Sequence, residues 1–137
     1  MYEPDGSYSV DEVLVAADSF EYYWAPQGYW AVDGRVSPIE ATLRGYVDSV
    51  FPGEWVFSML VKLTTGDSIP PHCDKPLADG VVRRHLVLAT NPLSWCMHDY
   101  TWQQMETGGV YTMRPEFIHA AINWGSTPRL HLVVDTK

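Results

Sequence analysis

The fold is decided by the stretch Phe117-Ile-His-Ala-Ala-Ile-Asn-Trp-Gly-Ser-Thr-Pro-Arg-Leu-His-Leu-Val-Val-Asp135. It predicts two strands, 117–123 and 129–135, separated by the turn residues Trp124–Pro128. Side chains alternate between the two faces of a strand. If His119 points inward, Ala121 and Asn123 do too, and the small Ala121 leaves room for a ligand. If Arg129 points inward, His131 and Val133 share its face.

Three upstream segments extend this β pattern. The near-continuous apolar run Trp55–Leu63 is typical of a buried strand, and 81–89 and 109–113 are further strand candidates. Turn signals at Asn91-Pro92, 107–109 and 114–116 separate the strand candidates. Several short strands with such turns predict a mainly β sandwich or barrel, a class to which jelly-roll cupins belong. On the strand 81–89, parity places Arg83, His85 and Val87 on one face.

The first third of the chain has a different pattern. Ser9-Val-Asp-Glu12 is a capping box that predicts a short helix over about 10–19. Ser37-Pro-Ile-Glu40 predicts a second helix that ends before Pro52-Gly53. Between them lies the aromatic segment Phe20–Trp30. We therefore expect one domain, 1–137, with a helical and aromatic part over about 1–54, its short helices packed outside a β-barrel over about 55–137.

Composition narrows the class of protein. The chain has 137 residues, 46% hydrophobic, with a formal net charge of −8, which makes nucleic-acid binding an unfavoured function. Two cysteines do not form a disulfide framework. The first residues lack a signal-peptide pattern, and no apolar run has the length of a membrane span. We expect a soluble cytoplasmic protein without a membrane partner.

A set of polar residues indicates a metal site. His72-Cys73-Asp74 places His72 and Asp74 on the same side of an extended strand, with Cys73 pointing away. Together with His119 they form the two-histidine, one-carboxylate set that binds non-haem Fe(II) with open coordination positions. Arg129 follows, a planar fork suited to a co-substrate carboxylate. The ionisable residues that parity brings into one barrel are His72, Asp74, Arg83, His85, His119, Arg129 and His131.

These residues lie in an ordered series of motifs that starts near Ser58 and ends at Asp135. The motifs are Gly66-Asp-Ser-Ile-Pro-Pro-His72, Arg83-Arg-His-Leu-Val-Leu88, Gly108-Gly-Val-Tyr-Thr-Met-Arg-Pro-Glu-Phe-Ile-His119, Asn123-Trp-Gly125 and Arg129-Leu-His-Leu-Val-Val-Asp135. In this series the chain resembles Fe(II)/2-oxoglutarate-dependent dioxygenases of the aspartyl/asparaginyl β-hydroxylase type.

The resemblance implies a double-stranded β-helix in which His72 and His119 bind iron. It implies that Arg129 pairs with the far carboxylate of 2-oxoglutarate, and that Arg83 and His85 approach the carboxylate nearer the metal. The chain departs from the name-giving hydroxylases at two positions. Asp74 completes a triad that those enzymes lack, which places the chain with smaller relatives. Val61 stands where they carry a serine that contacts the co-substrate.

The resemblance also implies the activity, hydroxylation of a C–H bond of an amino acid, free or in a peptide, with O2 and 2-oxoglutarate consumed. The alternatives are a cupin metalloenzyme that does not use 2-oxoglutarate, disfavoured by Arg129, and a non-catalytic ligand-binding cupin. The aromatic segment Tyr22–Trp30 is either a substrate wall or core. His131 is expected to pack inside the barrel, on a face from which it can also contact a residue that binds the metal or co-substrate. Cys96 and His98, in a hairpin-like region, are expected to be surface or packing residues.

Overall fold

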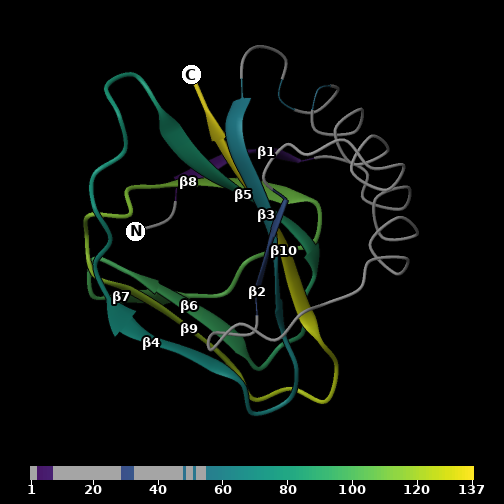
Figure 1. Ribbon diagram of the computed structural model, residues 1–137. Helices are drawn as coiled ribbons and strands as arrows, with labels where there is room; N and C mark the ends of the chain where they lie inside the picture. The colour runs from purple at the N-terminus through teal and green to yellow at the C-terminus, as the bar shows by residue number, and fades with distance from the viewer. Residues whose placement is uncertain (1–2, 8–28, 33–47, 49–50, 52–54) are drawn as a thin grey trace.

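Antiparallel β-sheet accounts for nearly all regular structure in the computed structural model, which describes residues 3–7, 29–32, 48, 51 and 55–137. The strands form two sheets that face each other (Figure 1). The prediction of a mainly β fold is confirmed. Within the described part, no helix is long and apolar enough to span a bilayer.

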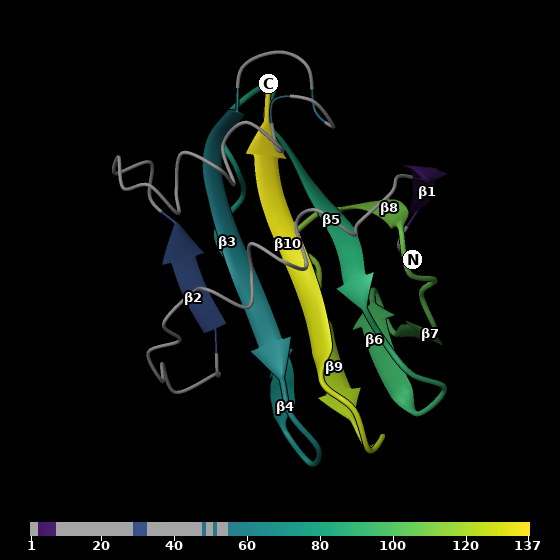
Figure 2. The ribbon, with the colours of Figure 1, turned by 90° about the vertical axis from the view of Figure 1, so that its right-hand side faces the viewer.

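The larger sheet has the strand order β1-β8-β5-β10-β3-β2. Strand β10 lies between β5 and β3 and pairs with both along nearly its whole length (Figure 2). The bounds are β1 Glu3–Ser7, β2 Tyr29–Val32, β3 Trp55–Leu63, β5 Val82–Ala89, β8 Gly109–Met113 and β10 Arg129–Thr136.

The smaller sheet has the order β4-β9-β6-β7. Its strands are β4 Ser68–His72, β6 Ser94–His98, β7 Thr101–Gln103 and β9 His119–Asn123. A tight turn between β6 and β7 places Asp99 and Tyr100 at φ 52° and 65°, the left-handed conformation required by hairpins of this kind. In this sheet His72, His119 and His98 are consecutive cross-strand neighbours.

The sequence-based expectations fit the second half of the chain better than the first. Strands β3 and β8 have their expected bounds, and β5, β9 and β10 differ slightly at one end. Strands β1 and β2 were not expected, and β6 and β7 form a hairpin in the region expected to be hairpin-like. The extended strand expected at His72 and Asp74 ends at His72, so Asp74 lies in the loop after β4. The expected helix over 10–19 lies outside the described residues, as does the helix from Ser37 apart from Asp48, which is helical. Residues 22–24 are also outside them, whereas Tyr29 begins an edge strand.

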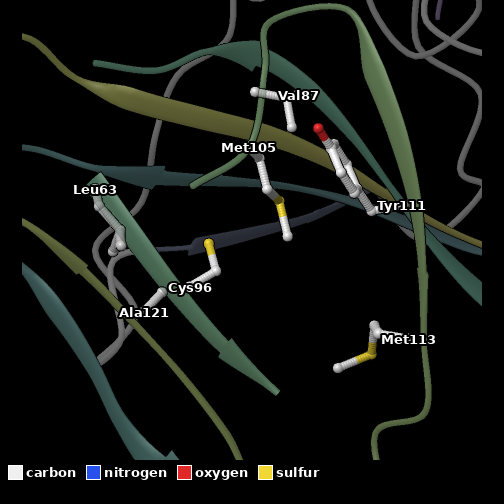
Figure 3. Close-up of a cluster of buried hydrophobic side chains, with 7 residues drawn as sticks. All are labelled: Leu63, Val87, Cys96, Met105, Tyr111, Met113 and Ala121. Carbon is white, nitrogen blue, oxygen red and sulfur yellow. The ribbon is translucent and has the colours of Figure 1, made fainter. Parts of the chain in front are cut away.

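A hydrophobic cluster fills the space between the sheets (Figure 3). Val87 belongs to it, whereas Leu86 and Leu88 are buried on the opposite face of β5, as the two-residue period requires. The cluster joins the two sheets because Ala121 and Cys96 come from the smaller sheet and the other strand residues from the larger one. Its members are Leu63, Val87, Cys96, Met105, Tyr111, Met113 and Ala121.

Asn123 ties the strands together at one end of the barrel. It is fully buried, and its Nδ2 donates to the carbonyl of Leu63, 2.9 Å away. Its Oδ1 accepts hydrogen bonds from Asn91 Nδ2, Ser94 Oγ and Gly125 N, each at 3.0 Å. A buried amide with these bonds satisfied stabilises a unique arrangement of the loops that it joins.

We predict that Gly125→Ala lowers the free energy of unfolding by about 2 kcal/mol. A Cβ at this position would lie 1.9 Å from Asn91 Oδ1. The Asn91 side chain cannot move aside without losing hydrogen bonds, because its amide bonds Asn123 Oδ1, Leu93 N and Thr127 O. Urea unfolding measures the change. The neighbouring exposed Ser126, changed to Ala, is the control and should leave stability unaltered; equal effects of the two changes would contradict the prediction.

Candidate metal and anion site

Two paired strands and the loop after one of them bring the expected triad together. His72 ends β4 and His119 begins β9, and the two residues are direct partners across the antiparallel pair. Asp74 follows β4, with Oδ2 3.2 Å from His119 Nε2 and 3.6 Å from His72 Nε2. One ligand atom from each of the three residues lies within 4.8 Å of the others. Ligands on one face of an octahedron lie about 3 Å apart, so the spacing is suited to a divalent metal.

Backbone carbonyls orient both imidazoles. Nδ1 of His72 lies 2.8 Å from the carbonyl oxygen of Pro70, and Nδ1 of His119 lies 2.8 Å from that of Phe117. Nδ1 is therefore the protonated nitrogen in each ring, and Nε2 carries a lone pair. Two lone pairs and a carboxylate oxygen face one another, which is repulsive unless a cation lies between them. The donor set and its orientation fit a bound metal ion.

The triad lies at the outer end of a cavity. The side chains of His72 and Asp74 are 38% and 46% exposed, whereas His119 is largely buried. Burial lowers the pKa of His119, which keeps the ring neutral and available as a ligand. Cys73 is exposed and does not line the cavity, as expected from its position between His72 and Asp74.

The cavity has a volume of about 440 Å³, within the range of small-molecule sites. Its polar lining is formed by the six expected residues His72, Asp74, Arg83, His85, His119 and Arg129, and by Lys75. The rest of the lining is mainly apolar and includes Phe57, Met59, Val61, Ile69, Met113 and Val133. The structure thus brings the sequence-predicted site residues into one chamber.

Arg129 is the most buried charged residue of this chamber, at 3% exposure. Its Nη2 donates to His131 Nδ1 at 2.9 Å and contacts Cys96 Sγ at 3.5 Å. Its Nε and Nη1 have no hydrogen-bond partner, and no carboxylate pairs with it, among the residues that the structure describes. A buried cation without a counter-charge is costly, so a bound anion would stabilise this end of the cavity.

Arg83, in contrast, is already paired. Its Nε and Nη2 donate to the two carboxylate oxygens of Asp135 at 2.8 and 2.9 Å. The two residues are cross-strand neighbours on β5 and β10, which accounts for the bidentate geometry. The structure places Arg83, and not Arg84, in the cavity lining, and its charge is largely compensated there.

His85, which lines the cavity, and the fully buried His131 form a hydrogen-bonded pair next to Arg129. Their Nδ1 atoms are 3.1 Å apart. Because Arg129 can only donate, the Nδ1 atom of His131 must be unprotonated, and His85 must carry its proton on Nδ1 to form the second bond. Burial, and then the charge of Arg129, hold the pKa of both rings well below the usual 6.5. Both imidazoles are therefore neutral at physiological pH.

Sequence reasoning missed two residues of the site. Asp135 has the same strand parity as Arg129, His131 and Val133, so the alternation that placed those three inward was a sufficient signal for it. Lys75 follows the triad carboxylate in a loop, where no periodicity places a side chain. Cys96 and His98 are both buried, as packing residues.

The lowered pKa values predict acid sensitivity. A histidine with a folded pKa below its unfolded value binds its proton preferentially in the unfolded state, so its contribution is complete above about pH 6.5 and is lost as the pH falls. Each such proton changes the free energy of unfolding by about 1.4 kcal/mol per pH unit. Unfolding measured between pH 7 and 5 should show His131→Asn with a slope shallower by about one proton than that of the parent. Identical slopes would contradict this prediction.

Three solved structures overlap with most of the chain. The cupin domain of Schizosaccharomyces pombe Cnp3 is 11% identical with a TM-score of 0.59, covering 88% of this chain and 71% of that one. A Cupin 2 conserved barrel domain protein from Salinispora arenicola is 10% identical with a TM-score of 0.56, covering 85% and 82%. A cupin protein from Bacteroides fragilis is 11% identical with a TM-score of 0.52, covering 86% and 83%. At these identities the similarity shows the fold alone, and it confirms the predicted cupin barrel.

No curated protein sequence matches the chain. The family described as Aspartyl/Asparaginyl beta-hydroxylase matches residues 46–137, which is more than half of the chain. That range holds the His72, Asp74 and His119 triad, the buried Arg129 and every other residue of the cavity lining. The chain therefore belongs to the aspartyl/asparaginyl beta-hydroxylase family, with a cupin barrel as its fold.

Proposed function

We propose that the protein is an Fe(II)- and 2-oxoglutarate-dependent dioxygenase that hydroxylates a C–H bond of an amino acid, free or in a peptide. The observation that carries the proposal is Arg129, a buried guanidinium with two unsatisfied N–H-bearing atoms in the cavity that also holds the triad. A small dicarboxylate with a metal-chelating end satisfies both features at once. The amino-acid substrate is inferred from the family alone.

His72, Asp74 and His119 are proposed to hold Fe(II), because their orientation presents two Nε2 lone pairs and a carboxylate oxygen to one point. When bound, the iron and 2-oxoglutarate would supply the oxidising chemistry, in which O2 is consumed, 2-oxoglutarate becomes succinate and CO2, and one oxygen atom enters a C–H bond. The apolar wall, including Val61, Met113 and Val133, excludes water from the cavity and strengthens the charge interactions inside it.

Arg129 is proposed to bind the carboxylate farther from the metal, through Nε and Nη1. Arg83 has Nη1 left for the nearer carboxylate, since its other two nitrogens bond Asp135. The expected contact between His85 and that carboxylate is less favourable. Its Nδ1 proton is directed to His131, which leaves Nε2 without a proton to donate. We therefore assign the nearer contact to Arg83 and treat His85 as a partner of His131.

The alternative functions give different products. A cupin metalloenzyme that does not use 2-oxoglutarate would release no succinate, and a non-catalytic cupin would bind a ligand without turnover. The buried Arg129 favours the dioxygenase over both, because neither alternative requires an anion-binding residue beside a metal site. Succinate release by the Fe(II)-loaded protein, measured with 2-oxoglutarate and O2, distinguishes the dioxygenase from both alternatives, and its absence would refute the proposal.

The metal assignment predicts that His72→Ala and His119→Ala abolish Fe(II) binding, because each removes one of three protein ligands. Calorimetric titration of Fe(II) under anaerobic conditions, or of Mn(II) in its place, provides the measurement. Cys73→Ala is the matched control, since Cys73 lies between two of the ligands in sequence but is exposed and outside the cavity. Undiminished affinity in both histidine variants would disprove the assignment.

The co-substrate assignment predicts that Arg129→Lys raises the KM for 2-oxoglutarate more than about tenfold, equivalent to about 1.4 kcal/mol. Lysine keeps the charge but lacks the planar fork that binds a carboxylate through two nitrogens. Succinate formation at varied 2-oxoglutarate gives the KM. Arg114→Lys is the control, because Arg114 is an exposed residue paired with Glu116. If Arg129→Lys left the KM unchanged, the anchor would have to be another cation of the cavity.

A further inference from the structure

His131 occupies a position in the barrel where few other side chains can accept a hydrogen bond. It lies on β10 two residues after Arg129, with 1% exposure. Its partners on the two flanking strands are Val61 and Val87, which have no polar side-chain atoms. Among the residues that the structure describes, the other hydrogen bond of the Arg129 guanidinium goes to the Cys96 sulfur at 3.5 Å, a weak acceptor. The 2.9 Å bond to His131 Nδ1 is thus the strong constraint on the orientation of Arg129.

The histidine also receives a second hydrogen bond. Arg129 Nη2 and His85 Nδ1 converge on the same acceptor, at 2.9 and 3.1 Å. The permanent charge of the guanidinium makes the reverse tautomer of His131 unfavourable, since that would set two donors against each other. The hydrogen-bonded series His85, His131 and Arg129 therefore has one defined arrangement of protons. In this arrangement Arg129 Nη2 is bonded to His131 and is not available to a ligand.

We propose that His131 is a positioning residue: by accepting a hydrogen bond from Arg129 Nη2, it fixes the guanidinium so that Nε and Nη1 are the nitrogens presented to a bound carboxylate. The proposal rests on the proposed function insofar as the carboxylate is that of 2-oxoglutarate. Burial and the charge of Arg129 keep the ring neutral, so the acceptor persists across the physiological pH range.

Without His131 the guanidinium would remain charged and buried, but it would lose its one strong internal acceptor. Rotation about the side-chain bonds would then spread its donors over several orientations. A carboxylate would have to restore the productive one at an entropic cost. Affinity for the co-substrate would fall. Metal affinity would be unaffected, because the triad shares no residue with the hydrogen-bonded series.

Two substitutions separate positioning from packing. His131→Leu removes the acceptor and keeps a side chain of similar size. His131→Asn retains an acceptor oxygen near the position of Nδ1. We expect His131→Leu to weaken 2-oxoglutarate binding to the Mn(II)-loaded protein about tenfold, and His131→Asn to remain within about threefold of the parent. Mn(II) affinity should be unchanged in both variants. Cys96→Ala, which removes the weaker contact, is the control and should bind 2-oxoglutarate like the parent.

Parent-like binding of 2-oxoglutarate by His131→Leu would overturn the proposal, as would equal losses in the Leu and Asn variants, which would indicate packing alone. Nitrogen NMR of the ligand-free parent gives a second test, which does not depend on how the variants fold. It should show that Nδ1 of His131 is unprotonated and that Nδ1 of His85 is protonated. The opposite pattern would also overturn the proposal. Failure of the parent to bind 2-oxoglutarate would refute the proposed function, and the NMR result would still decide whether His131 holds Arg129.

Discussion

The structure depends on the position of β10 between two antiparallel partners. All eight of its residues are buried, and β3 and β5 pair with it along nearly its whole length. Such a strand cannot shift its register by one residue without exchanging its two faces. The pairing therefore fixes which side chains enter the barrel, and these include two charged groups, Arg129 and Asp135, at opposite ends. The anion-binding part of the cavity follows from this constraint, whereas His72, Asp74 and His119 come from β4, the loop after it and β9 of the smaller sheet.

Each of these two buried charges is stabilised by hydrogen bonds to a neighbouring side chain. Asp135 is neutralised by Arg83 on the neighbouring strand, through two hydrogen bonds. Arg129 has a neutral acceptor in His131 but no carboxylate partner within the described residues. The cavity is lined by the cations Lys75, Arg83 and Arg129 and by one carboxylate, Asp74, and Asp135 neutralises Arg83, so one positive charge is in excess. That excess contrasts with the formal charge of −8 of the whole chain and concentrates attraction for anions inside the cavity.

Sequence reasoning was most successful where the two-residue period is clean. Strands β3 and β8 were predicted with their observed bounds, and parity correctly separated Val87 from Leu86 and Leu88. Only the end of β4, at His72, was anticipated, because Pro70 and Pro71 interrupt its pattern, and the bounds of β7 were not predicted because it has only three residues. The bond between His85 and His131 was also unpredictable, because it depends on the register of β5 against β10, which a single sequence does not specify.

The two proposed binding functions of the cavity lie at positions that differ in solvent exposure. The metal triad lies at the more exposed end, where His72 and Asp74 remain partly in contact with solvent, so a divalent ion can reach its ligands without opening the barrel. Arg129 is the most buried charged residue of the lining, and the low dielectric around it would strengthen its attraction for a carboxylate. The same burial makes the free protein less stable than a ligand-bound form, because the desolvation cost of the cation is not repaid until an anion arrives. If the proposed function holds, a site built in this way would discriminate strongly between a dicarboxylate and a neutral molecule of the same size, since the neutral molecule would leave the guanidinium unpaired.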